Sequence, residues 1–369
     1  MSQKITLGIP RERKMLEKRV AVTPDGAADL VKLGATVVVE ENAGLGSHFT
    51  NEQYTQAGCE LTNSLEKIWS SNVIVKVKEP HEEEYKHFKA GSLLFDYLHL
   101  ASMPDVAKAL LEAKVTSVGY ELVQTAEKRL PLLEPMSEVA GKLSIVLGSY
   151  HLLSQKGGRG ILTGGVVGVL PAKVVIVGGG IAGRNACEVA MGMGADVTII
   201  DISWAKLDQI KRMYQGRVKT LHSTKGSISR ALLDADLVIG SVLIPGAAAP
   251  KIITEDMVKS MQKGSVIVDI SIDQGGCVET IRPTSLDEPV YEKHGVIHYG
   301  VCNMPAQTPR TSTLALTAAT LPYIMKIVKG GGVDGVMNDL ELRNAINTHN
   351  GKLTNKAVSE AIGIAYSEL

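Results

Sequence analysis

Two hydrophobic patterns alternate along the first third of the 369-residue chain. Short apolar runs rich in β-branched residues are separated by stretches with helical spacing, the clearest being residues 25–33 and 104–113. Alternation of this kind is typical of a parallel sheet covered by helices on both faces. It predicts a doubly wound α/β domain with strands at residues 5–7, 36–39, 73–77, 93–95 and 117–119.

A second α/β pattern begins with the apolar run 172–177, which is followed by Gly178, Gly180 and Gly183. After an amphipathic stretch, the apolar run 196–200 ends on Asp201, about 20 residues beyond the glycines. In a dinucleotide-binding turn, Gly178 permits the tight turn, Gly180 lets the backbone approach a pyrophosphate, and Gly183 lets the helix pack on the strand. A carboxylate at Asp201 would accept the ribose hydroxyls and repel a 2′-phosphate, so the pattern predicts NAD rather than NADP. The alternative is an ordinary glycine turn with an incidental aspartate.

The remaining pattern defines the domain organisation. A helix is expected over 137–154 with Ser137 as its N-cap, and strands at 237–239, 265–269 and 296–299 complete the second sheet. After Pro305 the sequence indicates no strand, only helices at 311–326, 339–347 and 356–366, which must cover a sheet already built. We therefore expect two doubly wound domains: a Rossmann NAD-binding domain over 131–305, inserted in a discontinuous substrate or catalytic domain formed by 1–130 and 306–369.

Composition narrows the range of partners. The 39 basic residues balance the 39 acidic ones, which argues against nucleic acid and against an anionic membrane and favours a small-molecule ligand. The four cysteines form no C-x-x-C pair or short metal-ligand spacing, so no metal site is expected. The start of the chain lacks the apolar core of a signal peptide, which favours a cytoplasmic setting.

Four polar residues are expected near or just beyond the carboxyl ends of strands, where open α/β sheets bind their ligands: Arg19, Lys76, His99 and Asp273. Three belong to the first domain and one to the second, so we expect them to meet across a cleft between the two sheets. Each also has a structural interpretation. Arg19 is read alternatively as a solvated surface residue, Lys76 as an edge-strand lysine, His99 as a core histidine and Asp273 as a turn former.

Together these residue types suit hydride transfer on a small 2-oxo or 2-amino acid. Arg19 can bind a substrate carboxylate with two hydrogen bonds, and Lys76 adds a compact positive charge. His99 has the ordinary pKa that suits proton transfer near neutrality. Asp273 can orient water or stabilise a cationic intermediate.

The chain resembles the alanine dehydrogenase family over nearly its whole length, with the nucleotide-binding subunit of proton-translocating transhydrogenase as a wider relative. Six segments in the right order carry the resemblance: 19–24 (RVAVTP), 75–80 (VKVKEP), 98–100 (LHL), 135–141 (PMSEVAG), 269–276 (DISIDQGG) and 303–306 (NMPA). The loop 13–17 departs from the usual pattern, because Met15 and Leu16 stand where polar residues are common.

The resemblance implies reversible, NAD-dependent oxidative deamination of L-alanine to pyruvate and ammonium, with hydride passing from Cα to nicotinamide. It implies that Arg19 and Lys76 bind the substrate carboxylate, that His99 is the acid/base and that Asp273 is the second catalytic group. It also implies a homohexamer, with the C-terminal helices packed on the first domain. The cofactor contacts it implies, beyond Gly178, Gly180, Gly183 and Asp201, are Ser137, Ile181, Ala182, Lys206, Ser223, Val242, Leu243, Ile270, Ser271, Ile272, Asp273, Arg282, Val301, Cys302, Asn303 and Met304.

Two other functions stay open at this stage. A transhydrogenase-type subunit would share the nucleotide fold but pass hydride to a second nucleotide held by a partner protein. A non-catalytic, NAD-responsive binding protein would have no use for Arg19, Lys76, His99 and Asp273 as a set.

Overall fold

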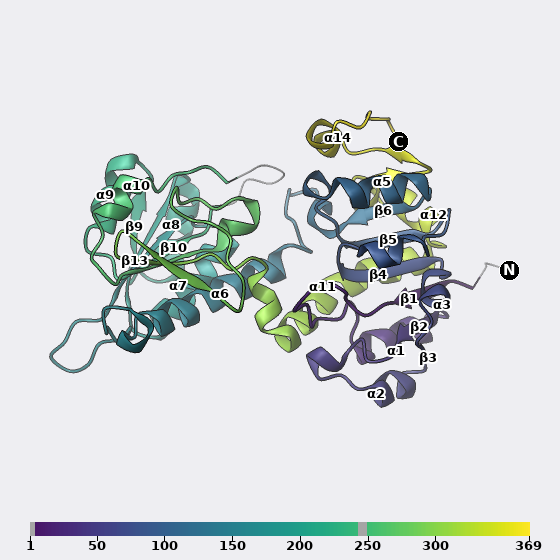
Figure 1. Cartoon of the computed structure of the whole chain (residues 1–369), viewed down its shortest axis with the longest axis horizontal. Helices are drawn as coiled ribbons and strands as arrows, with labels where there is room; N and C mark the ends of the chain where they lie inside the picture. Colours follow the sequence, from purple (N-terminus) through teal and green to yellow (C-terminus); the bar gives the residue numbers. More distant parts are fainter. Residues whose placement is uncertain (1–3, 243–248) are drawn as a thin grey trace. The chain divides into compact units, whose positions relative to one another are not determined.

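The computed structural model describes residues 4–242 and 249–369, which form two compact units. Unit 1 comprises Met1–Met136 and Ala306–Leu369, and unit 2 comprises Ser137–Pro305. Each unit is built around its own mainly parallel sheet (Figure 1). The predicted fold class, with one doubly wound domain inserted in the other, is confirmed.

Unit 1 is built on an eight-stranded sheet with the order β15-β14-β6-β5-β4-β1-β2-β3. The strands from β6 to β3 in this order are all parallel. The chain winds outward from β1 in one direction through β2 and β3, and from β4 in the other through β5 and β6, so the winding direction switches between β1 and β4. These strands are β1 (Thr6–Ile9), β2 (Thr36–Glu40), β3 (Glu60–Thr62), β4 (Val73–Lys78), β5 (Leu93–Tyr97) and β6 (Thr116–Gly119).

Helices cover this sheet and connect its strands. Thr23 caps α1 by accepting a hydrogen bond from Gly26 N, and Pro104 opens α5, where its missing N–H costs nothing. The N-terminal part of unit 1 contributes α1 (Pro24–Lys32), α2 (Asn51–Gln56), α3 (Leu65–Trp69), α4 (Glu82–Tyr85) and α5 (Pro104–Glu112). The C-terminal part contributes α11 (Pro309–Lys329), α12 (Val333–Met337), α13 (Leu340–Arg343) and α14 (Lys356–Ile362).

The expectation that no strand follows Pro305 is wrong. Strand β14 (Ile346–His349) pairs antiparallel with β6, and β15 (Lys352–Leu353) pairs antiparallel with β14. The helix predicted over 339–347 is therefore shorter in the structure, where it is α13 (Leu340–Arg343). Strand β14 was missed because Asn347 and Thr348 are polar. Thr348 can be buried because its hydroxyl is satisfied: Oγ1 donates to Val115 O at 2.9 Å and forms a hydrogen bond with Ser117 Oγ at 2.7 Å.

The long helix α11 packs within unit 1 through both threonines and apolar residues, since its buried side chains include Thr313, Thr317 and Thr320 as well as Leu316, Ile324 and Ile327. Thr313 Oγ1 accepts a hydrogen bond from Val20 N, and Thr317 Oγ1 accepts one from Thr23 N, both at 3.2 Å. These bonds satisfy buried backbone groups in the loop between β1 and α1. The C-terminal part of the chain therefore fixes the loop that carries Arg19.

Unit 2 contains a seven-stranded sheet with the order β12-β13-β11-β10-β7-β8-β9, in which only β12 runs antiparallel to its neighbour. Its winding direction switches between β7 and β10, the arrangement of a Rossmann domain. The strands are β7 (Lys173–Val177), β8 (Asp196–Asp201), β9 (Lys219–His222), β10 (Leu237–Gly240), β11 (Val266–Asp269), β12 (Val290–Lys293) and β13 (Val296–Tyr299). The helices are α6 (Glu134–His151), whose first residues belong to unit 1, α7 (Ile181–Gly192), α8 (Trp204–Met213), α9 (Lys225–Leu232) and α10 (Glu255–Lys259).

The prediction of Ser137 as a helix N-cap is wrong, because α6 begins at Glu134 and Ser137 lies inside its first turn. Pro135 fits the start of this helix, where the proline N–H is not required. Farther along α6, a Cβ on Gly141 would lie 2.2 Å from Ala182 O, so this glycine allows α6 to approach the start of α7. No helix in the described part of the chain has the length and apolar character needed to cross a membrane.

Candidate active site

The glycine turn after β7 has the geometry that a dinucleotide-binding turn requires. Gly178 has φ +110°, and a Cβ there would lie 2.4 Å from Ser241 O. A Cβ on Gly183 would lie only 1.8 Å from Gly178 O, whereas one on Gly180 would meet no atom within 4 Å. The protein itself therefore requires glycine at 178 and 183, while Gly180 leaves open space into which a ligand phosphate can approach the backbone.

The N-terminus of α7 follows directly from this turn. Its N-cap is Gly180, which has no side chain to cap the first backbone N–H groups, and the first turn contains no acidic residue. These N–H groups, including those of Ile181 and Ala182, are oriented to bind an anion with the positive end of the helix dipole. The turn and helix therefore fit a pyrophosphate.

Asp201 ends β8 beside the glycine turn. Its Oδ2 accepts a hydrogen bond from Gly179 N at 2.6 Å, and its Oδ1 accepts one from Ser203 N at 2.7 Å. Lys206 Nζ lies 3.7 Å from Oδ2. The carboxylate thus lies at the edge of the turn, in the position from which ribose hydroxyls are bound in Rossmann domains.

Most other predicted cofactor residues lie at the same edge of this sheet, because they follow the carboxyl ends of parallel strands. Ser223 follows β9, Val242 follows β10, and Ser137 lies one helical turn before Gly141 on the same face of α6. Arg282 lies against Gly300 and stacks on the Tyr291 ring, with its Cζ 4.3 Å from the ring centroid. Leu243 lies outside the described residues. The rest of the set follows β11 and β13, namely Ile270, Ser271, Ile272, Asp273, Val301, Cys302, Asn303 and Met304.

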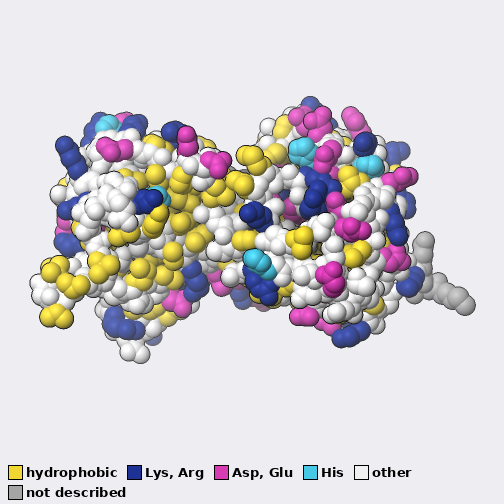
Figure 2. Space-filling model, turned by 60° about the horizontal axis from the view of Figure 1, so that its bottom comes forward, with side chains coloured by type: hydrophobic (Ala, Val, Ile, Leu, Met, Phe, Trp, Pro, Cys, Tyr) yellow, Lys and Arg dark blue, Asp and Glu magenta, His cyan; other side chains and the backbone are white. Residues whose placement is uncertain are grey.

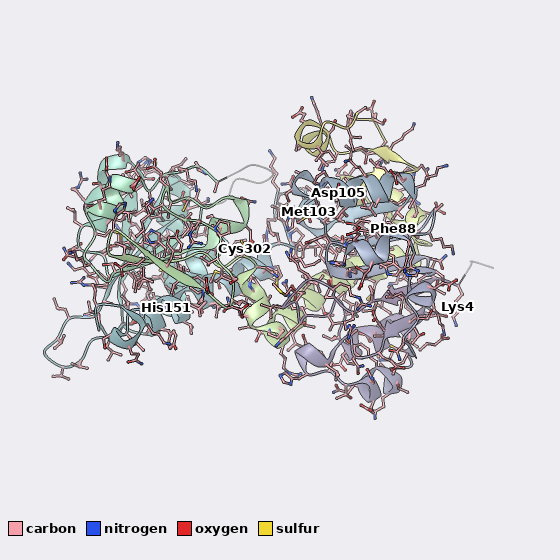
Figure 3. All side chains as sticks on the ribbon, viewed as in Figure 1. Lys4, Phe88, Met103, Asp105, His151 and Cys302 are labelled. Atoms are coloured by element: carbon pink, nitrogen blue, oxygen red, sulfur yellow. The ribbon has the colours of Figure 1, made fainter. Side chains whose placement is uncertain are left out.

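Asp273 lies in the 3-10 helix Ile270–Gln274 with its side chain exposed. Its Oδ1 and Oδ2 accept hydrogen bonds from Asn303 N at 3.0 and 3.3 Å, which connects the two loops that follow β11 and β13. Cys302, the neighbour of Asn303, is exposed and is labelled in Figure 3. Asp273 therefore combines an exposed carboxylate with a contact that a simple turn former does not need.

The sequence interpretation missed Asp269, which supports Asp273. Asp269 is buried and accepts hydrogen bonds from Ser271 N, Cys277 N and Val278 N at 3.0, 2.7 and 3.1 Å. Burial raises the pKa of its carboxyl to about 6 in spite of these bonds. No sequence signal separates such an aspartate from an ordinary strand end.

In unit 1, Arg19 is buried and is not a solvated surface residue. Its Nε donates to Glu17 Oε1 at 2.7 Å and its Nη2 to Glu17 Oε2 at 2.6 Å, while Nη1 donates to Met136 Sδ at 3.1 Å. Burial acts to lower the pKa of Arg19, but Glu17 outweighs it and the net pKa is raised. Arg19 thus stays a cation inside the unit.

Lys76 lies in β4, between β1 and β5, so its interpretation as an edge-strand lysine is wrong. Its Nζ is buried, donates to Glu84 Oε1 at 3.1 Å and lies 3.7 Å from Glu12 Oε2. Burial acts to lower the pKa of Lys76, but the two glutamates outweigh it and the pKa is raised. Burial raises the pKa of Glu12 to about 7.

His99 follows β5 and is not a core histidine, since its side chain is 44% exposed. It has φ +47°, and its backbone N donates to Glu121 Oε1 at 2.8 Å. Its Nδ1 lies 4.0 Å from the same oxygen, and its ring stacks on Tyr97 with 6.1 Å between centroids. Glu121, which the sequence interpretation missed, therefore holds the backbone that sets the direction of the imidazole.

A second missed residue, Asp96, lies on β5 between Phe95 and Tyr97. It is fully buried, and within the described part of the chain neither of its carboxylate oxygens has a hydrogen-bond partner. Burial, reinforced by Glu121, raises the pKa of Asp96 well above its ordinary value, although Lys76 acts in the opposite direction. Burial thus favours the protonated form of this acid, which lies on β5 three residues before His99.

The structure thus brings Arg19, Lys76 and His99 to the carboxyl ends of β1, β4 and β5, around the switch point of unit 1. Asp273 lies at the corresponding edge of unit 2, and its meeting with the other three stays a prediction. A doubly wound domain with a phosphate-binding glycine turn, joined to a second doubly wound domain with buried cations at its switch point, defines a class of two-domain nucleotide-binding proteins.

Comparison with known proteins identifies the family within this class. The family model "Alanine dehydrogenase/PNT, N-terminal domain" matches residues 8–140, and "Alanine dehydrogenase/PNT, C-terminal domain" matches residues 144–356. The chain therefore belongs to the alanine dehydrogenase/PNT family.

Full-length relatives support this assignment. An alanine dehydrogenase of Staphylococcus saprophyticus is 50% identical over 98% of both chains, and one of Methanococcus maripaludis is 50% identical over 98% of this chain and 97% of the relative. A solved L-alanine dehydrogenase structure has a TM-score of 0.94 at 43% identity, covering 97% of this chain and 99% of the other. The resemblance expected from the sequence is confirmed.

Proposed function

We propose that this protein is an L-alanine dehydrogenase that interconverts L-alanine and pyruvate with ammonium, using NAD. The observation that carries the proposal is the grouping of Arg19, Lys76 and His99 at the switch point of unit 1, in a chain half identical to proteins named alanine dehydrogenase. Small-molecule substrates also agree with the balanced charge of the chain.

The substrate roles follow from the side-chain chemistry. Arg19 and Lys76 are buried cations, so a substrate carboxylate bound to them gains from a low local dielectric. His99 is exposed at the end of β5 and is assigned the proton transfers to and from the reacting amine and water. Asp273 is assigned the orientation of that water and the stabilisation of the cationic imine.

The residues of unit 2 fit NAD. Gly180 leaves space for a pyrophosphate at the N-terminus of α7, and Asp201 offers a carboxylate to ribose hydroxyls and disfavours a 2′-phosphate. When bound, NAD supplies the hydride acceptor at nicotinamide. The cofactor contacts proposed for the loops after β9, β10, β11 and β13 complete this site.

Steady-state assays of the purified protein test the proposal. With NAD and a panel of L-alanine, L-serine, glycine and L-2-aminobutyrate, we expect NADH to form fastest with L-alanine, and pyruvate plus ammonium to oxidise NADH in the reverse assay. NADPH is expected to be a much poorer reductant. Absence of NADH formation with every amino acid would leave a transhydrogenase-type subunit or a binding protein as the better assignment.

We also propose that the protein is a homo-oligomer, as its family resemblance implies a hexamer, located in the cytoplasm. The buried cysteines Cys59, Cys187 and Cys277 form no disulfide in the described part of the chain, which agrees with a reducing compartment. Support for self-association comes from an apolar hairpin after α6, in which Val166 and Val169 pair and no residue from 160 to 172 is charged. In Figure 1 this hairpin projects from unit 2 at the lower left, and Figure 2 shows hydrophobic side chains gathered at that end.

The hairpin and the neighbouring face of α6 are the surface that we propose for a two-fold interface. Thr163 Oγ1 donates to Ser149 Oγ at 2.8 Å, which fixes the base of the hairpin to α6. The surface thus combines a projecting hairpin with a helix face, so that two copies can each place the hairpin on the other's helix. A stable interface buries about 800 Å² on each partner, and the exposed apolar side chains here supply an area of that order. They are Val146, Tyr150, Leu162, Val166, Val167, Val169, Leu170 and Met193.

The double variant V167D/L170D is expected to form a smaller assembly than the wild type, because two carboxylates cannot be buried against an apolar partner surface. Light scattering coupled to size-exclusion chromatography measures the molar mass. L340D is the matched control, since Leu340 is 71% exposed in unit 1, far along the chain from the hairpin. An unchanged mass for V167D/L170D, or an equal loss in L340D, would contradict the assignment of this surface.

A further inference from the structure

Each of the two cations proposed to bind the substrate carboxylate is already paired with a buried carboxylate of unit 1. The side chains of Arg19 and Glu17 are 1% and 0% exposed, and those of Lys76 and Glu84 are both 0% exposed. A buried ion pair of this kind gives little net stability, because the desolvation of both charges offsets their attraction. The pairs therefore call for an explanation other than stability.

The Arg19–Glu17 pair has a defined geometry. A guanidinium presents two edges to a carboxylate, one formed by Nε and one Nη, the other formed by the two Nη atoms. Glu17 occupies the first edge with hydrogen bonds of 2.7 and 2.6 Å. Its Oε1 also accepts a hydrogen bond from the backbone N–H of Arg19 at 3.1 Å. Glu17 thus fixes both the plane and the backbone of Arg19.

We propose that Glu17 is a positioning residue that fixes the guanidinium plane of Arg19 for binding of the substrate carboxylate. This inference rests on the proposed function and deepens it. With the Nε edge occupied, a carboxylate that binds Arg19 in two hydrogen bonds must approach the edge that includes Nη1. That atom also donates to Met136 Sδ at 3.1 Å.

Fixing the plane of Arg19 fixes the orientation of the bound substrate. The two parallel hydrogen bonds of a guanidinium–carboxylate pair hold the carboxylate in the guanidinium plane, so the direction of the Cα atom follows from the orientation of Arg19. Glu17 therefore acts on the reaction through Arg19 and needs no contact with the substrate.

The variant Glu17→Gln tests this role. The glutamine amide has only one oxygen that can accept a hydrogen bond from Arg19, and its NH₂ group would face the second Arg19 donor without bonding to it. The two-bond Arg19–Glu17 pair is therefore lost at nearly constant side-chain volume. We expect the KM for pyruvate to rise about tenfold or more, the loss typical of a charge-assisted hydrogen bond, while kcat changes much less. The dissociation constant of NADH, measured by fluorescence titration, should not change.

An uncharged substrate analogue separates positioning from a general structural effect. Pyruvamide lacks the carboxylate that pairs with Arg19, so its turnover should be about equal in the wild type and in E17Q. The conservative variant Glu17→Asp keeps a carboxylate and should recover part of the affinity for pyruvate. Glu83→Gln is the matched control, since Glu83 is 53% exposed, pairs with Arg13 and should leave the KM unchanged.

Three results would overturn the role of Glu17. An unchanged KM for pyruvate in E17Q would show that Arg19 needs no such partner. A lower KM would show that Glu17 competes with the substrate for Arg19. An equal loss with pyruvate and pyruvamide would show a structural role only. Failure of the proposed function is distinguishable from all three, because it would appear as the absence of alanine and pyruvate turnover in the wild type.

Discussion

Replacing His99 with alanine is expected to lower the rate of alanine oxidation by roughly a thousandfold, within the range that general acid–base groups contribute. The imidazole lies at the end of β5 with an exposed face, and its backbone is fixed by Glu121. The methyl side chain of alanine cannot accept or donate a proton, so water would have to carry out every proton transfer in the variant. NADH should still bind with wild-type affinity, because the glycine turn and Asp201 belong to unit 2.

Stopped-flow or steady-state NADH formation measures the loss, and fluorescence titration measures NADH binding. His294→Ala is a matched control, since His294 also has positive φ, 58°, and also lies beside a glutamate, with Nε2 2.6 Å from Glu255 Oε1. It lies in the turn between β12 and β13, at the opposite edge of its sheet from the cofactor residues. Turnover of H99A within tenfold of the wild type would remove His99 from the reaction.

The central strands and the edge of the sheet that carries the site could be predicted from sequence. Strands such as β4 and β5 are buried on both faces and read as continuous apolar runs, which parallel sheets require. Because parallel strands end at a common edge, Lys76 and His99 could be assigned to that edge from their positions alone. The edge strand β14 was not predictable in this way, because its inward side chains include polar residues that depend on partners in β6.

The carboxylates around the cations were not predictable, because their contacts depend on tertiary structure. Glu84 reaches Lys76 from α4, and Glu12 reaches it from the loop after β1, more than 60 residues earlier in the chain. In the sequence both lie in charged stretches that are typical of a solvated surface. Asp96 interrupts an apolar strand, but only the structure shows that none of the described residues gives its oxygens a hydrogen-bond partner.

Asp96→Asn is expected to stabilise the protein, and by more at pH 8 than at pH 5. In the folded chain burial raises the pKa of Asp96 well above the ordinary value of about 3.9 that it has when unfolded. Folding above the unfolded pKa is therefore coupled to proton uptake, and the wild type loses stability as pH rises from the unfolded pKa to the folded pKa. The loss amounts to about 1.4 kcal/mol for each pH unit in that interval, and asparagine, which does not titrate, abolishes it.

Urea unfolding at pH 5 and pH 8, at one protein concentration, measures the difference between D96N and the wild type. Glu12, whose pKa of about 7 also lowers stability over this range, is present in both proteins, so its own burial contributes to both unfolding curves. Asp339→Asn is the control of opposite sign. Burial acts to raise the pKa of Asp339, but Lys326 and the backbone N–H groups of α13 outweigh it and the pKa is lowered. The stability Asp339 provides is present above its unfolded pKa, so D339N should destabilise the protein about equally at pH 5 and pH 8. If D96N differed from the wild type by the same amount at both pH values, Asp96 would have to be ionised in the folded chain, and the substrate site would contain one more negative charge than we infer.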